Sequence, residues 1–172
     1  MAESAAVRAR DAVVTTHTEC RLCGSSRLAP VWSFGETPLA NAYLTGEELG
    51  RPELFVPLTV SRCETCALVQ LRETVSPDVL FQNYLYVSST SPAFVAHFEK
   101  YAAHLVERFH LSPDALVVEI GSNDGILLKP LLQRGVRVLG VEPAHAIAGR
   151  ALESGVPTVP EFFSSKLAAR LQ

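Results

Sequence analysis

The sequence predicts an α/β protein, in which a small α+β module resembling a zinc ribbon precedes the first part of a parallel sheet. Three observations lead to this prediction. All the cysteines lie in two C-x-x-C pairs within the N-terminal half. From residue 113 onward, short apolar runs alternate with helical patterns. Between the first such run and its helix lies a glycine-containing bend, EIGSNDG, at the position where parallel sheets bind ligands.

Length and composition narrow the class of protein. The chain has 172 residues, 48% of them hydrophobic, which is enough for one ordinary domain or two small ones. A net charge of −3 disfavours nucleic-acid binding through phosphate contacts. No apolar run approaches the roughly 20 residues of a membrane span, and the N-terminus lacks the apolar core of a signal peptide. We therefore expect a soluble, cytoplasmic protein that binds neither nucleic acid nor membrane.

The cysteine spacing predicts a metal site. Cys20 and Cys23 form one knuckle, and Cys63 and Cys66 form the other. Two knuckles of this spacing can complete a tetrahedron around Zn²⁺, although two disulfides or four reduced thiols remain alternatives. A closed Cys₄ site leaves no coordination position for water, so a zinc ion here would be structural. His17 lies near the first knuckle, where we expect an exposed side chain and not a ligand.

The region around the second knuckle has the pattern of a β-hairpin. The alternation of residue types over residues 54–60 is sufficient to predict a strand that leads into the knuckle. Residues 67–71 are the expected partner strand. Residues 35–44 are rich in turn-forming residues. The zinc-binding module is therefore predicted to span residues 15–75.

A connector and a helix follow, over residues 76–112. Ser91 suits the N-cap of this helix, and Pro92 suits its first position. Large apolar residues then recur at spacings of three and four, which predicts a helix face directed at the core. These residues are Phe94, Phe98, Tyr101, Leu105 and Phe109.

Residues 113–172 have the alternating pattern of a doubly wound, Rossmann-like sheet that is incomplete. The expected strands cover residues 115–120, 136–141 and 156–159. The expected helices cover residues 126–133 and 144–153, and a last one begins at Ser164 or Ser165. The first strand is expected to be buried, because it is apolar and β-branched.

The bend between the first strand and its helix is predicted to hold a ligand. Gly121 and Gly125 permit a close approach of the backbone, and the following helix start presents free N–H groups. Asn123 and Asp124 add polar side chains at the same place. Glu142 ends the next strand, where a carboxylate can accept hydrogen bonds from a ribose diol.

The loop pattern indicates the kind of cofactor. It reads E-x-G-x-x-x-G from Glu119, whereas the dinucleotide fingerprint is G-x-G-x-x-G. An acidic loop repels a pyrophosphate and suits a ligand with ammonium and sulfonium groups, such as S-adenosylmethionine. A strand–helix turn without a ligand and a dinucleotide-dependent oxidoreductase remain the alternatives.

Taken together, the motifs resemble those of one family. The Cys₄ pattern, GETPLANAYL, YLYVSSTS, EIGSNDG and GVEP occur in an order similar to that of the sugar C-methyltransferases. The resemblance covers residues 20–172. It implies a class I S-adenosylmethionine-dependent enzyme with an N-terminal zinc-binding domain. It also implies a nucleotide-linked 4-keto deoxysugar as the substrate.

The resemblance assigns roles to individual residues. It implies that structural zinc is held by Cys20, Cys23, Cys63 and Cys66. It implies that the methionine and ribose end of S-adenosylmethionine is lined by Glu119, Gly121, Asn123, Asp124 and Gly125. Glu142 would bind the ribose hydroxyls. A segment over the cofactor would include Tyr86, Ser88 and Ser91.

The chain also departs from the family pattern. Family members are considerably longer, and their catalytic Tyr, His and Glu belong to a later part of the cofactor domain. We therefore expect the N-terminal portion of such an enzyme, inactive alone: a fragment, a truncated gene product or half of a split enzyme. Its open sheet edge is expected to aggregate or to bind a partner chain that supplies the missing strands. The alternative is a non-catalytic zinc-binding interaction module.

Overall fold

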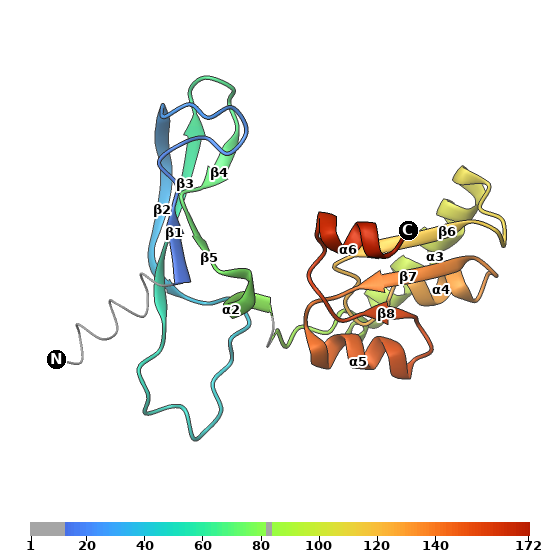
Figure 1. Ribbon diagram of the computed structural model, residues 1–172. Helices are drawn as coiled ribbons and strands as arrows, with labels where there is room; N and C mark the ends of the chain where they lie inside the picture. The colour runs from blue at the N-terminus through green and yellow to red at the C-terminus, as the bar shows by residue number, and fades with distance from the viewer. Residues whose placement is uncertain (1–12, 82–83) are drawn as a thin grey trace. The chain divides into compact units, whose positions relative to one another are not determined.

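The computed structural model describes residues 13–81 and 84–172. Contacts divide this part of the chain into two compact units, one up to Leu80 and one from Phe81 onward. The first unit is built on antiparallel strands and the second on a parallel sheet (Figure 1). The mixed α/β fold class predicted from the sequence is confirmed.

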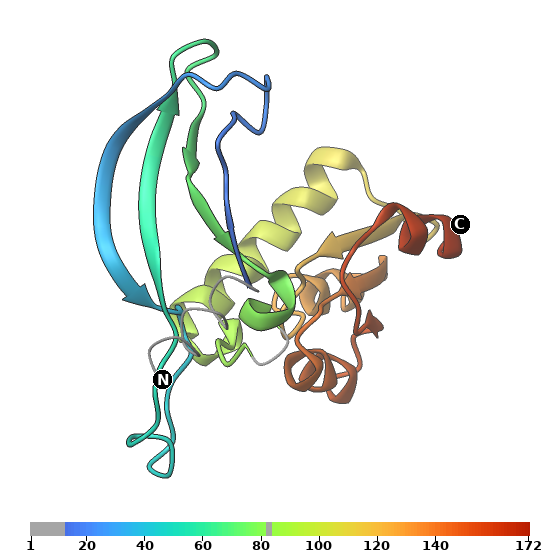
Figure 2. The ribbon, with the colours of Figure 1, turned by 60° about the vertical axis from the view of Figure 1, so that its left-hand side comes forward.

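The first unit contains a sheet in the order β2-β3-β4 and a ladder formed by β1 and β5. Figure 2 shows β2 and β3 as a long, curved antiparallel pair. The elements of this unit are β1 (Val14–Thr16), β2 (Leu28–Pro38), β3 (Phe55–Cys63), β4 (Val69–Leu71), β5 (Glu73–Val75) and α2 (Pro77–Phe81). The predicted hairpin corresponds to β3 and β4.

Strand β2 has no counterpart among the predicted strands. It contains Pro30, Gly35 and Pro38, which are unfavourable in strand interiors. The pairing with β3 shifts register between Pro30 and Trp32 and again between Ser33 and Glu36. These irregularities accommodate the proline and the glycine, so a strand forms where the local pattern indicates turns.

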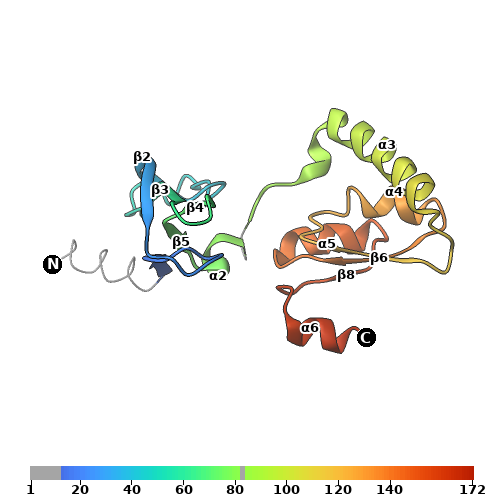
Figure 3. The same cartoon turned by 90° about the horizontal axis from the view of Figure 1, so that it is seen from above.

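The second unit is a parallel sheet in the order β6-β7-β8 with helices on both faces. Figures 1 and 3 show α3 and α4 on one face and α6 on the other. Its elements are the 3₁₀ helix η1 (Ser88–Thr90), α3 (Pro92–Phe109), β6 (Leu116–Ile120), α4 (Leu128–Leu132), β7 (Arg137–Val141), α5 (His145–Glu153), β8 (Thr158–Val159) and α6 (Ser165–Arg170). No helix within the described ranges has the length and hydrophobicity required to cross a membrane.

The face of α3 that contacts the core differs from the predicted one. Phe94, Tyr101 and Phe109 are 46%, 41% and 61% exposed. The core contact is made instead by Ala102, which is fully buried, with Val106 beside it. A small residue at this position lets α3 approach α4 closely, whereas the aromatic rings pack along the surface of the helix. The prediction of a core-facing row was therefore wrong for Phe94, Tyr101 and Phe109, whereas Phe98 and Leu105 are half-buried.

Strand β6 is also less buried than predicted. Leu116, Val118 and Ile120 are 51%, 43% and 58% exposed, while Val117 packs against the core on the opposite face. Among the described residues β6 pairs with β7 alone, so it is an edge strand. An apolar row on an edge strand predicts further packing partners.

Candidate functional site

The four cysteines converge at one end of the first unit. Their sulfur atoms all lie within 4.8 Å of one another. The sulfurs of Cys20 and Cys66 are 3.6 Å apart, and so are those of Cys23 and Cys63. Tetrahedral Zn–S bonds of about 2.3 Å place sulfurs about 3.8 Å apart, whereas a disulfide requires about 2.0 Å. The arrangement fits a zinc ion, and all four thiols are free of disulfides.

The two knuckles have the same local geometry. Gly24 donates its N–H to Cys20 O, and Ala67 donates its N–H to Cys63 O, both at 2.9 Å. Both residues have left-handed backbones, with φ of 71° for Gly24 and 62° for Ala67. Each turn folds its two thiols toward the same point, which is why the x-x spacing produces a metal site.

The electrostatics of the knuckles favour the thiolate at one cysteine of each pair, whereas burial and the neighbouring thiols raise the pKa of Cys23 and raise that of Cys66 to about 12. Hydrogen bonds from the backbone N–H groups of Cys66 and Thr65 lower the pKa of the Cys63 thiol to about 6. A hydrogen bond from the Cys23 N–H lowers the pKa of Cys20 in the same way. Thiolates are the form that binds zinc. His17 stays outside this cluster, and its Nε2 lies 2.9 Å from Thr74 Oγ1, between β1 and β5.

The second candidate site is the loop of residues 121–125, here named the GSNDG loop. Gly121, Asn123 and Gly125 have φ of 73°, 49° and 80°. Among the described residues, no atom lies within 4 Å of a Cβ added to Gly121, so this side of the loop is open to a ligand. A Cβ on Gly125 would instead meet the Val156 side chain at 3.0 Å. The two glycines thus serve different purposes: one leaves space and the other permits packing.

Two carboxylates lie together beside the loop. Glu142 is 6% exposed; its Oε2 accepts a hydrogen bond from Asn123 N, and its Oε1 accepts one from Ala144 N, both at 2.9 Å. Burial and the nearby charge of Glu142 raise the pKa of Glu119 to about 7. A positively charged ligand would favour ionisation of Glu119 at this place.

Unpartnered polar atoms gather at the same loop. In the described part of the chain, four buried side-chain atoms lack a hydrogen-bond partner. Three of them are Glu119 Oε2, Ser122 Oγ and Asp124 Oδ1. Buried acceptors without partners are rare in folded proteins and often indicate a missing ligand, ion or water. The loop therefore has the chemistry to bind a group rich in hydrogen-bond donors or in positive charge.

The residues 86–90, here named the YVSST segment, lie against the loop. Ser88 N donates to Asn123 Oδ1 at 2.9 Å, and Ser89 N donates to Asp124 Oδ2 at 3.2 Å. Asn123 Nδ2 donates to Tyr86 O at 3.0 Å. The contacts of Tyr86 and Ser88 thus come from their backbones. The predicted Ser91 hydroxyl instead caps α3, accepting from Phe94 N at 3.4 Å.

Comparison with known proteins adds an independent finding. Residues 20–81 match a family model described as "Putative zinc binding domain". Over 155 residues the chain is 42% identical to the C-methyltransferase NovU of Streptomyces niveus, a match that covers 90% of this chain and 37% of NovU. By these matches the chain is similar to the N-terminal part of a C-methyltransferase. It spans little more than a third of the length of this relative.

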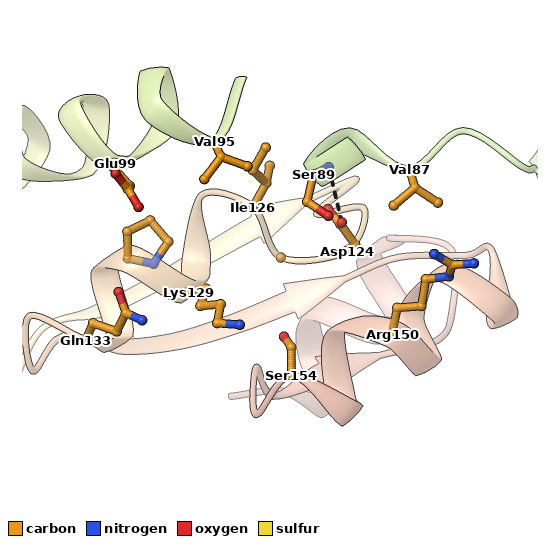
Figure 4. Close-up of a pocket in the computed structure, with 12 residues that line it drawn as sticks. Val87, Ser89, Val95, Glu99, Asp124, Ile126, Lys129, Gln133, Arg150 and Ser154 are labelled. Atoms are coloured by element: carbon orange, nitrogen blue, oxygen red, sulfur yellow. Dashed lines mark hydrogen bonds between the residues drawn. The ribbon is translucent and has the colours of Figure 1, made fainter. Parts of the chain in front are cut away.

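A cavity of about 450 Å³ lies in the second unit, between α3, α4 and α5 (Figure 4). Of the predicted cofactor residues it includes only Asp124 and Gly125. Lys129 and Arg150 extend into it from α4 and α5. The cavity therefore adjoins the GSNDG loop without coinciding with the predicted site.

The way Asn123 and Asp124 are used was not apparent from the sequence. Both were assigned to a ligand, yet each side chain also accepts a hydrogen bond from the YVSST segment. These contacts join residues 35 positions apart. No local sequence pattern predicts these hydrogen bonds, because they depend on how the connector packs against the folded sheet.

Proposed function

We propose that this chain provides the zinc module and the cofactor-binding loop of an S-adenosylmethionine-dependent C-methyltransferase. The proposed substrate is a nucleotide-linked keto-deoxysugar, in keeping with the family resemblance. The observation that carries the proposal is the set of unpartnered acceptors on Glu119, Ser122 and Asp124 beside the carboxylate of Glu142. S-Adenosylmethionine supplies an electrophilic methyl group on a sulfonium and also carries an ammonium, so acidic surroundings suit it.

The residues of the loop have separate tasks in this proposal. Gly121 leaves room for the ligand, because a side chain there would occupy the open space. Glu142 uses only one acceptor site on each oxygen for backbone N–H groups, which leaves others for the ribose hydroxyls. Glu119 and Asp124 provide negative charge close to the loop.

The proposed zinc ion has a structural task. Four thiolates saturate a tetrahedral zinc, so no position is left for water or substrate. The ion would hold the turn before β2 to the turn between β3 and β4, at one end of the sheet. In the first unit the bound ion would supply stability that a domain of this size cannot obtain from a large hydrophobic core.

We also propose a polypeptide partner for the edge of the second unit. The side chains of Leu116, Val118 and Ile120 form an apolar row that is more exposed than expected for a sheet with all its packing partners. Additional strands beside β6 would pair with its free edge, and the segments that connect them would cover the apolar row and would bring the base and substrate contacts that the methyl transfer requires. Such strands can come from the same polypeptide or from a separate chain.

Titration calorimetry on the zinc-loaded chain tests the cofactor proposal. The expected result is saturable binding of S-adenosylmethionine, weakened at least tenfold by Glu142→Gln and unchanged by Glu153→Gln on the exposed surface of α5. Binding of NAD in preference to S-adenosylmethionine would contradict the proposal and indicate a dehydrogenase. A folded, zinc-loaded chain that binds neither would be better described as a zinc-binding interaction module.

A further inference from the structure

Asn123 uses its side chain in an unusual way. Its amide oxygen accepts from Ser88 N, and its amide nitrogen donates to Tyr86 O. A side-chain amide carries the same donor and acceptor pair as a peptide group. Because the two partners are two residues apart, Asn123 bonds to the YVSST segment much as a neighbouring strand residue would.

The backbone of Asn123 is tied to the other side of the site. Its N–H donates to Glu142 Oε2 at 2.9 Å, and its φ is 49°, in the left-handed region that asparagine tolerates better than most residues. One residue thus contacts the YVSST segment through its side chain and the buried carboxylate through its backbone.

The YVSST segment has few other hydrogen bonds, and outside them the Tyr86 ring contacts the Tyr84 ring, with centroids 6.4 Å apart. Among the described residues, its hydrogen bonds to other segments go to Asn123 and Asp124. The remaining ones are internal, such as Thr90 Oγ1 to Val87 O at 2.8 Å. Asn123 provides two of the three external bonds. Loss of its amide should therefore loosen residues 86–88, which Asn123 alone holds by hydrogen bonds to another segment among the described residues.

We infer that Asn123 is a positioning residue whose amide fixes residues 86–88 over the GSNDG loop, so that the YVSST segment covers the ligand site. The covering role rests on the proposed function, whereas the attachment itself does not. A ligand bound beneath the segment would leave slowly while the amide is in place and faster once it is removed.

Two variants of Asn123 distinguish the effect of segment attachment on ligand binding from the effect of local charge. Asn123→Gly keeps the left-handed backbone and removes the amide. Asn123→Asp keeps an acceptor for Ser88 N but loses the donor to Tyr86 O, and it adds a negative charge. If charge alone governed binding, Asn123→Asp would hold a cationic ligand more tightly. If attachment of the YVSST segment governs binding, the Asn123→Asp variant should instead hold the ligand less tightly.

Hydrogen exchange measured by NMR on the zinc-loaded full chain tests the attachment without any ligand. We expect Asn123→Gly to speed exchange of the Ser88 amide about tenfold, as for the loss of two hydrogen bonds. The Ser89 amide should change less, because Asp124 still accepts from it. Asn41→Gly is a matched control, since Asn41 also has a left-handed φ, of 59°, in the other unit. Unchanged exchange at Ser88 would overturn the inference.

Dissociation of S-adenosylmethionine, followed by stopped-flow, tests the covering role. Both Asn123 variants should release it at least fivefold faster, with amide exchange in β7 unchanged as proof of folding. Equal dissociation rates would refute the covering role even if Ser88 exchange confirms the attachment. If the wild-type chain bound no S-adenosylmethionine, the proposed function and the covering role would fail together, and exchange at Ser88 would still decide the attachment.

Discussion

The metal centre and the GSNDG loop differ in how completely their polar groups are used. At the metal centre the four sulfurs face one another within 4.8 Å, so one ion can satisfy them all. At the loop, buried oxygens of Glu119, Ser122 and Asp124 face no partner among the described residues. The first arrangement is closed and suits a structural role, whereas the second is open and suits an exchangeable ligand. Changes to the two regions should therefore have different consequences.

Metal removal should have the largest effect, and it should be confined to the first unit. Structural zinc contributes about 10–16 kcal/mol to the folding of small zinc domains. Chelation, or Cys63→Ser, should abolish exchange protection in β3 and β4 while leaving β7 protected. Hydrogen exchange with and without chelator measures this, and metal analysis should give one zinc per chain. His17→Ala is the control that should keep the metal; persistent protection of β3 without zinc would argue against a structural ion.

Glu119→Gln should stabilise the second unit at high pH. Near pH 4 folded and unfolded chains both hold the Glu119 proton, so its contribution there is small. Between the ordinary pKa of 4.5 and the folded value of about 7, only the folded chain keeps the proton, and stability falls as pH rises. Above pH 7 the variant should gain about 2 kcal/mol after allowance for partial exposure. Denaturant unfolding at pH 4.5 and pH 8 measures the difference.

The same substitution should weaken binding of a cation. Glu119→Gln removes the charge that compensates an ammonium or sulfonium, so affinity for S-adenosylmethionine at pH 8 should fall about tenfold, or about 1.4 kcal/mol. Stability and binding would then change in opposite directions. A variant that is more stable and binds equally well would show that Glu119 lies outside the ligand site.

The exposed row on β6 should cause self-association of the isolated chain. Val118 is 43% exposed on an edge strand, and a lysine there should discourage pairing of edges. We expect Val118→Lys to raise the dissociation constant for self-association about tenfold, measured by sedimentation velocity. A wild-type chain that stays monomeric at high concentration would remove the reason for proposing a partner at this edge.

The sequence predicted the metal centre better than the surroundings of the loop, for a physical reason. Each knuckle is a local turn, so the spacing of Cys20 and Cys23 defines its geometry and only the meeting of the knuckles is non-local. The order of strands and helices after residue 113 was likewise apparent from periodicity. In contrast, the pairing of Asn123 with the YVSST segment and the exposed face of α3 depend on tertiary packing. Strand β2 was not predicted, because its prolines are typical of turns and only the register shifts in its pairing with β3 allow a strand there.

The smallest expected effect compares the two knuckles directly. Gly24 and Ala67 occupy equivalent left-handed positions, but a Cβ at such a position costs about 1 kcal/mol or more. Ala67→Gly removes that cost and adds backbone freedom to the unfolded chain, so it should stabilise the zinc-loaded first unit by about 0.5 kcal/mol. Gly24→Ala should destabilise it by about 1 kcal/mol, and thermal unfolding of both zinc-loaded variants measures the pair. If the two substitutions shifted stability in the same direction, the knuckles would not be equivalent turns, and the metal centre would be less symmetrical than its sulfur positions indicate.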